Sequence, residues 1–396
     1  MSSDLPKGWL NRKLSAIAQV NPESLAASTD LFFEFGYIDI SQIEQPGSCQ
    51  GWHQMHLRDA PSRARRLVKA GDVLVSTVRP YLRSFAKVPE ANIPLIASTG
   101  FAVVRAAENV DPEFLYQQIM DQRFSAYLIP RMTGSNYPAV SAKDVGEYLV
   151  PVPPLDEQRR IADILQSVDD AISALSCLLQ VYEKLLARYR WEVLHSLVDG
   201  TADNECCLGD ICNLGRGFAF KSEDYVADGV LNFRVTNIGR MISDIGEKKF
   251  LPYEYLEKYS DYILTGDEIV LVMVGATVGK LGRVPEEVCP ALLNQNMWIL
   301  RPKGEIAADL LWHLAHVLIS LKVHGAQGGA YSFLTKKDFL QHRIAKFSAS
   351  DISPHIDAMC AMEASIEVLV QEHDELLEMK KMLAADLLSG RVRVPA

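Results

Sequence analysis

A long run of apolar residues at alternating spacings of four and three dominates the middle of the chain. It starts at residue 161 and continues without a break to residue 193. A sustained heptad pattern of this kind is typical of a helix that packs along another helix in a coiled coil. The seam positions that it predicts are Ile161, Leu165, Val168, Ile172, Leu175, Leu179, Tyr182 and Leu186.

The same pattern returns near the end of the chain. His373 and Lys380 interrupt the apolar seam there, and we interpret them as register-setting or rim positions. Each helix of roughly 40 residues has a length on the order of 60 Å, and we expect the two to pack antiparallel as a spacer. The seam positions of the second helix are Met359, Met362, Ile366, Leu369 and Leu376.

Shorter apolar runs precede each long helix and indicate strands. Residues 72–78 and 268–274 are rich in valine, leucine and isoleucine, and each run follows a Gly-Asp turn. Helical apolar patterns follow at 112–128 and 307–323. Each half of the chain therefore predicts a mixed α/β (α+β) domain.

The two halves repeat each other. Residues 14–17 match 208–211 at an offset of 194, and residues 71–75 match 266–270 at an offset of 195. A near-constant offset over more than a hundred residues indicates an internal, pseudo-twofold repeat. The predicted organisation is a first domain at 1–152, a helix at 153–200, a second domain at 201–347 and a helix at 348–396.

The composition is that of a soluble globular protein. Hydrophobic residues make up 48% and charged residues 23% of the 396 residues. We find neither eighteen consecutive apolar residues nor an N-terminal signal core, so we expect no membrane partner and a cytoplasmic location. The 7 cysteines contain no C-x-x-C pair; reduced structural cysteines are favoured over a zinc or disulfide framework.

The net charge of −10 argues at first against a nucleic-acid partner, but its distribution reduces the objection. Residues 151–198 carry 5 basic and 7 acidic groups, and residues 348–396 carry 4 and 9. Seven of the ten excess negative charges therefore lie in the predicted helices. Residues 58–87, in contrast, carry eight basic and two acidic groups.

Familiar catalytic motifs are missing from the sequence. Residues 275–281 have three residues between their glycines and a leucine after the lysine, so they fail the phosphate-loop pattern and predict a β-turn-β connection. Gly215 and Gly217 lack the third glycine of a dinucleotide fingerprint. Neither H-E-x-x-H nor G-x-S-x-G occurs. We expect no catalytic residue and no metal site, although a constellation of distant residues stays open.

Two segments carry a resemblance to a known family. VPVPPLDEQRRI at residues 150–161 resembles the proline-rich turn and helix start that close a target recognition domain in the specificity (HsdS) subunits of type I restriction-modification enzymes. DLLSGRVRV at 386–394 is similar to that family's usual chain end, and residues 71–75, 266–270 and 275–279 fit its recognition domains. The departure is AKFSASD at 345–351, where the family often repeats the proline-rich turn.

The resemblance implies a non-catalytic subunit that decides where on double-stranded DNA the chemistry of its partners happens. Two methyltransferase subunits, which use S-adenosylmethionine, would bind to it, and restriction subunits, which use ATP and magnesium, would complete the assembly. The chain itself would hold no cofactor. Two different domains imply a bipartite, asymmetric target.

Candidate DNA contacts follow from side-chain chemistry, because arginine, lysine, asparagine and glutamine read base edges, while other basic and hydroxyl groups hold phosphates. Arg63, Arg65 and Arg66 lie close together in the sequence and are expected to contact phosphates rather than bases. In the first domain the candidates are Arg63, Arg65, Arg66, Arg79, Tyr81, Arg83, Ser135, Asn136 and Tyr137. In the second they are Lys221, Arg234, Asn237, Arg240, Gln327 and Tyr331.

Two other functions compete with this interpretation. A DNA methyltransferase with its own recognition region would need an Asn/Asp-Pro-Pro-aromatic motif, which the sequence lacks. A coiled-coil adaptor with two β-rich, protein-binding heads would suit the negative charge but not the family resemblance.

Overall fold

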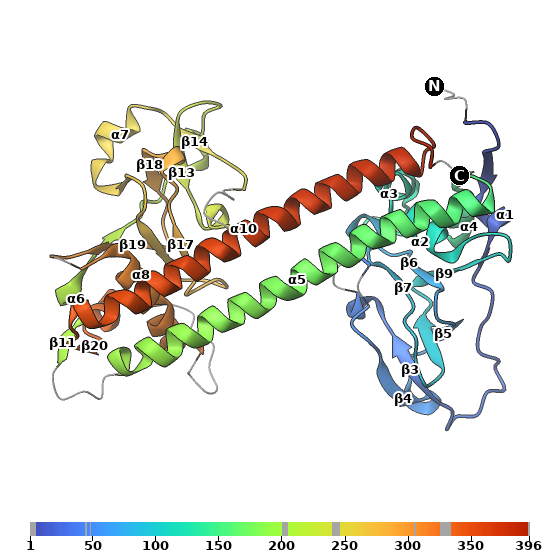
Figure 1. Cartoon of the computed structure of the whole chain (residues 1–396), viewed down its shortest axis with the longest axis horizontal. Coiled ribbons are helices and arrows are strands. Elements are labelled where there is room, and N and C mark those ends of the chain that lie inside the picture. The colour runs from blue at the N-terminus through green and yellow to red at the C-terminus, as the bar shows by residue number, and fades with distance from the viewer. Residues whose placement is uncertain are drawn as a thin grey trace. The chain divides into compact units, whose positions relative to one another are not determined.

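The chain forms two compact units that share two long helices. The first unit comprises Met1–Ala174 and His373–Ala396, and the second comprises Leu175–Glu372. Helices α5 (Leu155–Val198) and α10 (Ala349–Leu387) each contribute to both units (Figure 1). The computed structural model describes residues 5–43, 46–47, 49–199, 205–239, 246–304, 306–324 and 334–394.

An antiparallel sheet of order β2-β9-β6-β7 forms the centre of the first unit. Val73 and Val75 of β6 pack towards the helices, whereas Leu74 packs towards a second sheet. Both faces of β6 are therefore buried, which explains why the successive residues 73–75 are all apolar. The strands span Ala18–Val20 (β2), Phe101–Ala106 (β9), Val73–Ser76 (β6) and Phe85–Lys87 (β7).

The second sheet of this unit, β4-β3-β8-β5, is mixed, because β3 and β8 run parallel. A short pair, β1 with β10, brings the start of the domain beside its end. These strands span His53–His56 (β4), Glu34–Ile38 (β3), Leu95–Ser98 (β8), Ala64–Val68 (β5), Leu10–Lys13 (β1) and Leu149–Val152 (β10).

Helices cover the outer face of the first sheet. The predicted helix at 112–128 is two helices, α2 (Pro112–Met120) and α3 (Gln122–Leu128), because Asp121 ends one and caps the next. The backbone N–H of Asp121 donates to Gln117 O, and the Asp121 side chain accepts a hydrogen bond from the N–H of Arg123. The shorter helices are α1 (Leu14–Ile17) and α4 (Ala142–Gly146).

The second unit repeats this topology strand by strand, which confirms the predicted repeat. Its sheets have the orders β12-β19-β16-β17, β14-β13-β18-β15 and β11-β20, so every strand carries the number of its counterpart plus ten. The strands span Glu205–Cys207 (β11), Cys212–Arg216 (β12), Val230–Phe233 (β13), Phe250–Leu251 (β14), Ile263–Leu264 (β15), Ile269–Val272 (β16), Leu281–Arg283 (β17), Ala291–Leu293 (β18), Met297–Pro302 (β19) and Arg343–Ala345 (β20).

The helices of the second unit follow the same plan. The pattern at 307–323 forms α8, which continues into a π-helical turn, Ser320–His324. The predicted β-turn-β connection at 275–281 joins β16 to β17, and the two strands pair antiparallel. The helices span Leu208–Ile211 (α6), Tyr255–Lys258 (α7), Ala308–Ile319 (α8) and Lys336–Leu340 (α9).

The long helices run antiparallel within each unit. An ion pair joins Asp169 to Lys380 in the first unit, and a 2.9 Å hydrogen bond joins the hydroxyl of Tyr189 to Nδ1 of His355 in the second. Every predicted seam residue of both helices is buried or half-buried. The seam of α10 begins earlier than predicted, because Ile352 is also buried.

Helix α10 begins at Ala349, so Ser350 and Asp351 lie inside its first turn. Asp351 still places a negative charge at the positive end of the helix dipole. Gly200, the expected end of the first helix, lies outside the described residues.

A buried carboxylate joins three segments of the first unit. Glu157, in the first turn of α5, accepts hydrogen bonds from Nε1 of Trp9 at 3.2 Å and from Nε of Arg393 at 2.6 Å. Burial raises the pKa of Glu157, but the hydrogen bonds and charge of Arg393, helped by Trp9, outweigh it and hold that pKa below its ordinary value. The family-like chain end is thereby tied to the start of α5.

Helix α5 is apolar for a surface helix. Among the described residues it is the one helix long and apolar enough, by length and composition alone, to cross a membrane. The mean hydropathy of its most apolar 18-residue window is 1.2, and 17% of that window is buried. A single helix of this kind is weak evidence for a membrane span, and its heptad seam already accounts for part of the apolar character.

Candidate nucleic-acid interface

Two segments that are far apart in the sequence meet in the first domain. The backbone N–H of Arg79 donates to Pro138 O at 2.8 Å, which ties the loop after β6 to residues 133–139. The Arg79 guanidinium donates to the backbone oxygen of Asn136 at 3.5 Å, and its central carbon lies 5.0 Å from the ring centroid of Tyr137. The fold thus joins three candidates that the sequence placed in two separate groups.

The loop that carries Arg79 is strained. Arg79 and Arg83 flank a 3₁₀ turn, Pro80–Leu82, and both adopt left-handed backbone conformations, with φ of 49° and 54°. Arginine in this region costs energy that glycine would avoid, so the surrounding structure must hold the loop in place. At the tip of the turn Tyr81 and Leu82 are 45% and 58% exposed.

Arg83, another candidate for a DNA contact, makes a hydrogen bond inside the first domain. Its half-buried guanidinium donates to the backbone oxygen of Met120 at the C-terminal end of α2. This bond fastens one end of the strained loop to the helix layer and turns the charged group inward. Ser135, in contrast, is exposed in the turn that follows Gly134, whose φ is +93°.

The three closely spaced arginines differ in their surroundings. Arg63 pairs with Asp39 at 2.6 Å, and Nη1 of the half-buried Arg66 lies 3.4 Å from Oγ of Ser24. Arg65 is exposed on the edge strand β5 and enters no ion pair with a residue that the structure describes. Arg65 therefore has the freest charge of the three for a phosphate.

The basic segment and the Arg79 loop approach the same turn. The backbone N–H of Thr99 donates to Arg63 O at 2.8 Å, and the N–H of Thr77 donates to Gly100 O at 2.9 Å. The turn between β8 and β9 thus stands between the two groups. Arg63 and the Arg79 loop therefore lie beside the same turn, next to the ends of β8 and β6.

The described candidates of the second domain are less concentrated. Lys221 pairs with Glu223 at 3.0 Å with both side chains exposed, and such a pair contributes little to stability. Arg234 donates to the backbone oxygen of Glu247 at 2.9 Å and is mostly buried. Three further candidates lie outside the described residues: Arg240, Gln327 and Tyr331.

The side chain of Asn237 is buried and hydrogen-bonded inside the second domain. Its side chain is 2% exposed; its oxygen accepts from the backbone N–H of Arg234 at 2.8 Å, and its amide donates to Glu247 O at 2.9 Å. Its counterpart in the first domain, Gln42, accepts from the N–H of Asp39 in the same way. Each side chain closes the 3₁₀ turn that follows β3 or β13. Its amide oxygen is therefore already hydrogen-bonded to the backbone.

The second domain has a counterpart of the Arg79 loop that is not among the predicted contacts. The N–H of Met273 donates to Asn296 O at 3.0 Å, and the N–H of Leu334 donates to Met273 O at 2.7 Å. Thr77 makes the equivalent bonds in the first domain. The β16–β17 turn, with residues 274–277 exposed, therefore occupies the same place in the fold. The repeat offset of this loop was the signal that could have found it.

A polar cluster in the second unit resembles a metal site by residue type. One group of three potential metal ligands occurs in the part of the chain that the structure describes, with its ligand atoms within 4.8 Å of one another: His313, Cys360 and Glu363. Nε of Arg190 donates to Nδ1 of His313 at 2.9 Å, so Nε2 of this neutral imidazole carries the proton and has no lone pair for a metal. Arg190 and Trp312 already hold the Glu363 carboxylate. The cluster ties α5, α8 and α10 together by hydrogen bonds.

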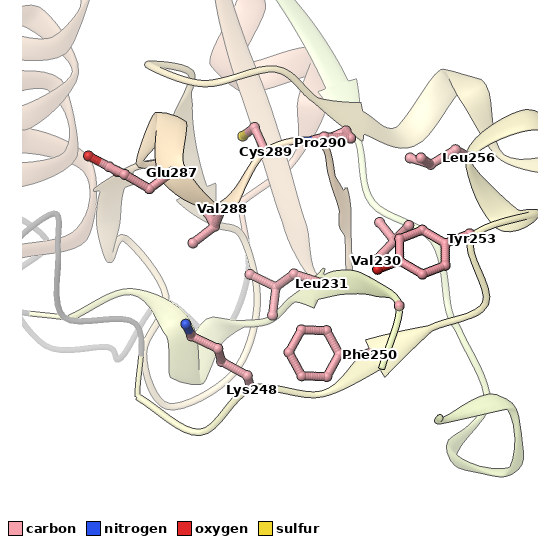
Figure 2. A pocket seen from close by; sticks show the side chains of 11 residues that line it. Val230, Leu231, Lys248, Phe250, Tyr253, Leu256, Glu287, Val288, Cys289 and Pro290 are labelled. Carbon is pink, nitrogen blue, oxygen red and sulfur yellow. The ribbon is translucent and has the colours of Figure 1, made fainter. Parts of the chain in front are cut away.

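A pocket of about 290 Å³ with both polar and apolar lining opens beside the edge strand β14 of the second domain (Figure 2). Lys248 and Glu287 are the charged members of its lining. Its thiol, Cys289, has a pKa raised to about 11, first by burial and then by nearby carboxylates. A protonated thiol without a neighbouring histidine in the lining does not form a nucleophilic site.

The fold and these loops define a class of protein: two like α/β domains that present different polar loops and share two long helices. The family model described as "Type I restriction modification DNA specificity domain" matches residues 6–180 and again residues 204–345. The chain belongs to this family and is a type I specificity subunit with two recognition domains.

Individual relatives agree with this assignment. The MjaVIII type I restriction enzyme specificity subunit of Methanocaldococcus jannaschii is 22% identical over 325 residues, which cover 76% of this chain and 75% of that protein. The EcoDI specificity subunit of Escherichia coli is 26% identical over 122 residues, or 29% of this chain and 26% of that protein.

Solved structures share the fold. A chain from a study of complex assembly and conformational transition of the type I R-M system has a TM-score of 0.59 at 22% identity, covering 98% of this chain and all of that one. The type I S subunit from M. genitalium has a TM-score of 0.54 at 14% identity, covering 98% of this chain and 97% of the other.

Proposed function

We propose that this chain is the non-catalytic, DNA-reading subunit of its enzyme and that its target is bipartite and asymmetric. Each recognition domain reads one half of the target, with unread base pairs between the halves. The observation that carries the proposal is the strand-by-strand repeat combined with different loops at equivalent places. The first domain presents Arg79 and Tyr137, whereas the second presents the glycine-rich β16–β17 turn. Loops of different chemistry select different bases.

Contacts to DNA are divided between bases and phosphates in this proposal. The cluster of Arg79, Asn136 and Tyr137 faces base edges in the first half-site, and Arg65 neutralises a phosphate. Neutralised phosphates supply affinity that falls with salt, while base edges supply specificity. Arg63 contributes less, because its ion pair with Asp39 must be broken or shared.

The long helices supply the docking surface for two methyltransferase subunits. On the part of α5 in the second unit, Leu178, Val181 and Leu185 are 41%, 54% and 52% exposed. A contiguous exposed apolar face marks an interaction site. The acidic helices would repel DNA, and bound methyltransferase subunits would cover that charge. S-adenosylmethionine, and the ATP and magnesium of restriction subunits, would be held by those partners, and we place the whole assembly in the cytoplasm.

Methylome sequencing tests the function directly. The chain is expressed with its methyltransferase subunit in cells that lack both, and the subunit expressed alone serves as the control. We expect one new methylated motif with two different half-sites and a fixed gap. Assembly of the complex without any new motif would refute the proposal and favour a protein-binding adaptor.

The docking surface has its own test. The double variant V181A/L185A should weaken binding to the methyltransferase subunit by about 10-fold or more, as loss of interface side chains does, while the stability of the chain changes little. Leu186→Ala is the matched control: its side chain is 4% exposed, so it should cost about 2–4 kcal/mol of folding stability. Unchanged assembly of the double variant would place the interface elsewhere.

A further inference from the structure

The guanidinium of Arg79 is held more firmly than a phosphate contact requires. Its backbone is fixed by the bond to Pro138 O, its Nη2 donates to Asn136 O, and its cationic group lies against the ring of Tyr137. A guanidinium within about 6 Å of an aromatic centroid gains a favourable cation–π contact. These restraints act together on a side chain that would otherwise move freely.

The backbone conformation points in the same direction. Arg79 has a φ of 49°, and Arg83 at the other end of the turn has a φ of 54°. The bond from Arg83 to Met120 O fastens the loop to α2. Strain of this kind persists only where the surrounding structure imposes it, and it is concentrated at binding sites. The loop therefore presents Arg79 in one prepared orientation.

A prepared arginine fork has a specific complement in DNA. Its parallel N–H groups match O6 and N7 of guanine in the major groove, the commonest base-specific contact that proteins make. A phosphate needs only positive charge and accepts a flexible side chain, as Arg65 on the edge strand provides. A fixed orientation of the Arg79 guanidinium helps binding only if it distinguishes one base from another.

We propose that Arg79 reads a guanine in the half-site of the first recognition domain and that Tyr137 and Arg83 are its positioning residues. The inference rests on the proposed function and adds to it a named base and a named reader. Tyr137 supports the guanidinium plane, and Arg83 holds the loop that carries it.

The test compares motifs methylated by the complex that contains wild-type chain, R79Q, R79K or Y137F. R79K should weaken the requirement for guanine at one position, because a lysine ammonium keeps the charge but not the fork. R79Q should lose the requirement, because a glutamine amide has neither the charge nor the fork and complements adenine instead. The preference for guanine there should fall roughly 5- to 150-fold. The other half-site and the gap should not change, which also shows that the variants are folded. Y137F keeps the aromatic ring and should read the wild-type motif.

Competition binding in vitro covers variants whose methylation is too weak to sequence. The purified complex is titrated with duplexes that carry the wild-type motif or a single substituted base pair, at several salt concentrations. An R79Q complex that still ranks all duplexes as wild type does, with uniformly lower affinity and a salt slope reduced by about 1, would make Arg79 a phosphate contact and overturn the inference. A wild-type complex without any bipartite motif would instead refute the proposed function.

Discussion

Neutralising Glu157 should loosen the junction between the first recognition domain, α5 and the chain end. The carboxylate is 4% exposed. It accepts hydrogen bonds from Nε and Nη2 of Arg393, at 2.6 and 2.8 Å, and from the indole N–H of Trp9. In Glu157→Gln the amide group would face one of these three donors with its own N–H. A buried donor left without an acceptor costs about 1–3 kcal/mol.

The size of the effect depends on how well water can replace the lost partner. Breaking a fully buried ion pair costs roughly 3–5 kcal/mol, but the Arg393 side chain is 44% exposed and can be hydrated. We therefore expect a loss of about 2 kcal/mol for Glu157→Gln. For a unit of this size, that loss corresponds to a decrease in Tm of about 4–8 °C.

Urea denaturation of the purified chain, followed by circular dichroism, measures the change. Asp156→Asn is the matched control, because Asp156 is the neighbouring carboxylate, its side chain is 82% exposed and its pair with Arg159 spans 3.5 Å. Exposed pairs of this kind contribute about 0–1 kcal/mol. A double-mutant cycle with Arg393→Gln should give a coupling of about 1–2 kcal/mol.

The pKa of Glu157 adds a signature in pH. Because the folded chain holds that pKa below its ordinary value, the contribution of the carboxylate is complete above about pH 4.5 and is lost as the pH falls through the folded pKa. The Gln variant should lack this acid-dependent loss. Equal stability of the Glu157 and Asp156 variants, or additive effects in the cycle, would refute the reasoning.

Two further predictions concern the second unit. Burial, reinforced by the charges of Arg190 and Arg283, lowers the pKa of His313 to about 3. In the unfolded chain the imidazole of His313 binds a proton below about pH 6.5, whereas in the folded chain it stays neutral. The free energy of unfolding should therefore fall by about 2 kcal/mol between pH 6.5 and 5. His313→Asn, which keeps an acceptor near the place of Nδ1, should remove its share of this slope in urea titrations; an unchanged slope would contradict a neutral histidine. Gly217→Ala should reduce stability by about 2 kcal/mol or more, because an added Cβ would lie 1.7 Å from a backbone oxygen, whereas Gly215→Ala meets its nearest atom only at 3.4 Å and should melt close to wild type.

The structure places the candidate contacts predicted from residue type in different surroundings. Arg79 and Tyr137 come together in the structure, although 57 residues separate Arg79 from Asn136, the neighbour of Tyr137. Asn237 and Arg83 have the right chemistry for DNA, yet their polar groups are used inside the domain. A polar side chain in a sequence does not reveal whether its hydrogen bonds are already satisfied, because its partners come from distant segments.

The sequence by itself determined the repeat, the strand-rich domains and the seam of the long helices. Each of these is a regularity along the chain: a period of 3.5 residues for a packed helix, an apolar run for a strand buried on both faces, and a constant offset for duplicated domains. The family motif at 150–161 depends equally on neighbouring residues.

Tertiary structure alone decided which side chains share a site. The loop at Arg79 meets Tyr137, the turn after β16 occupies the equivalent place in the second domain, and Glu157 meets Arg393 over a separation of 236 residues. Periodicity determines which face of an element is buried, whereas the partner on that face depends on how the elements pack. For this reason the sequence predicts two recognition domains on two helices, and only the fold indicates which of their polar groups remain available to DNA.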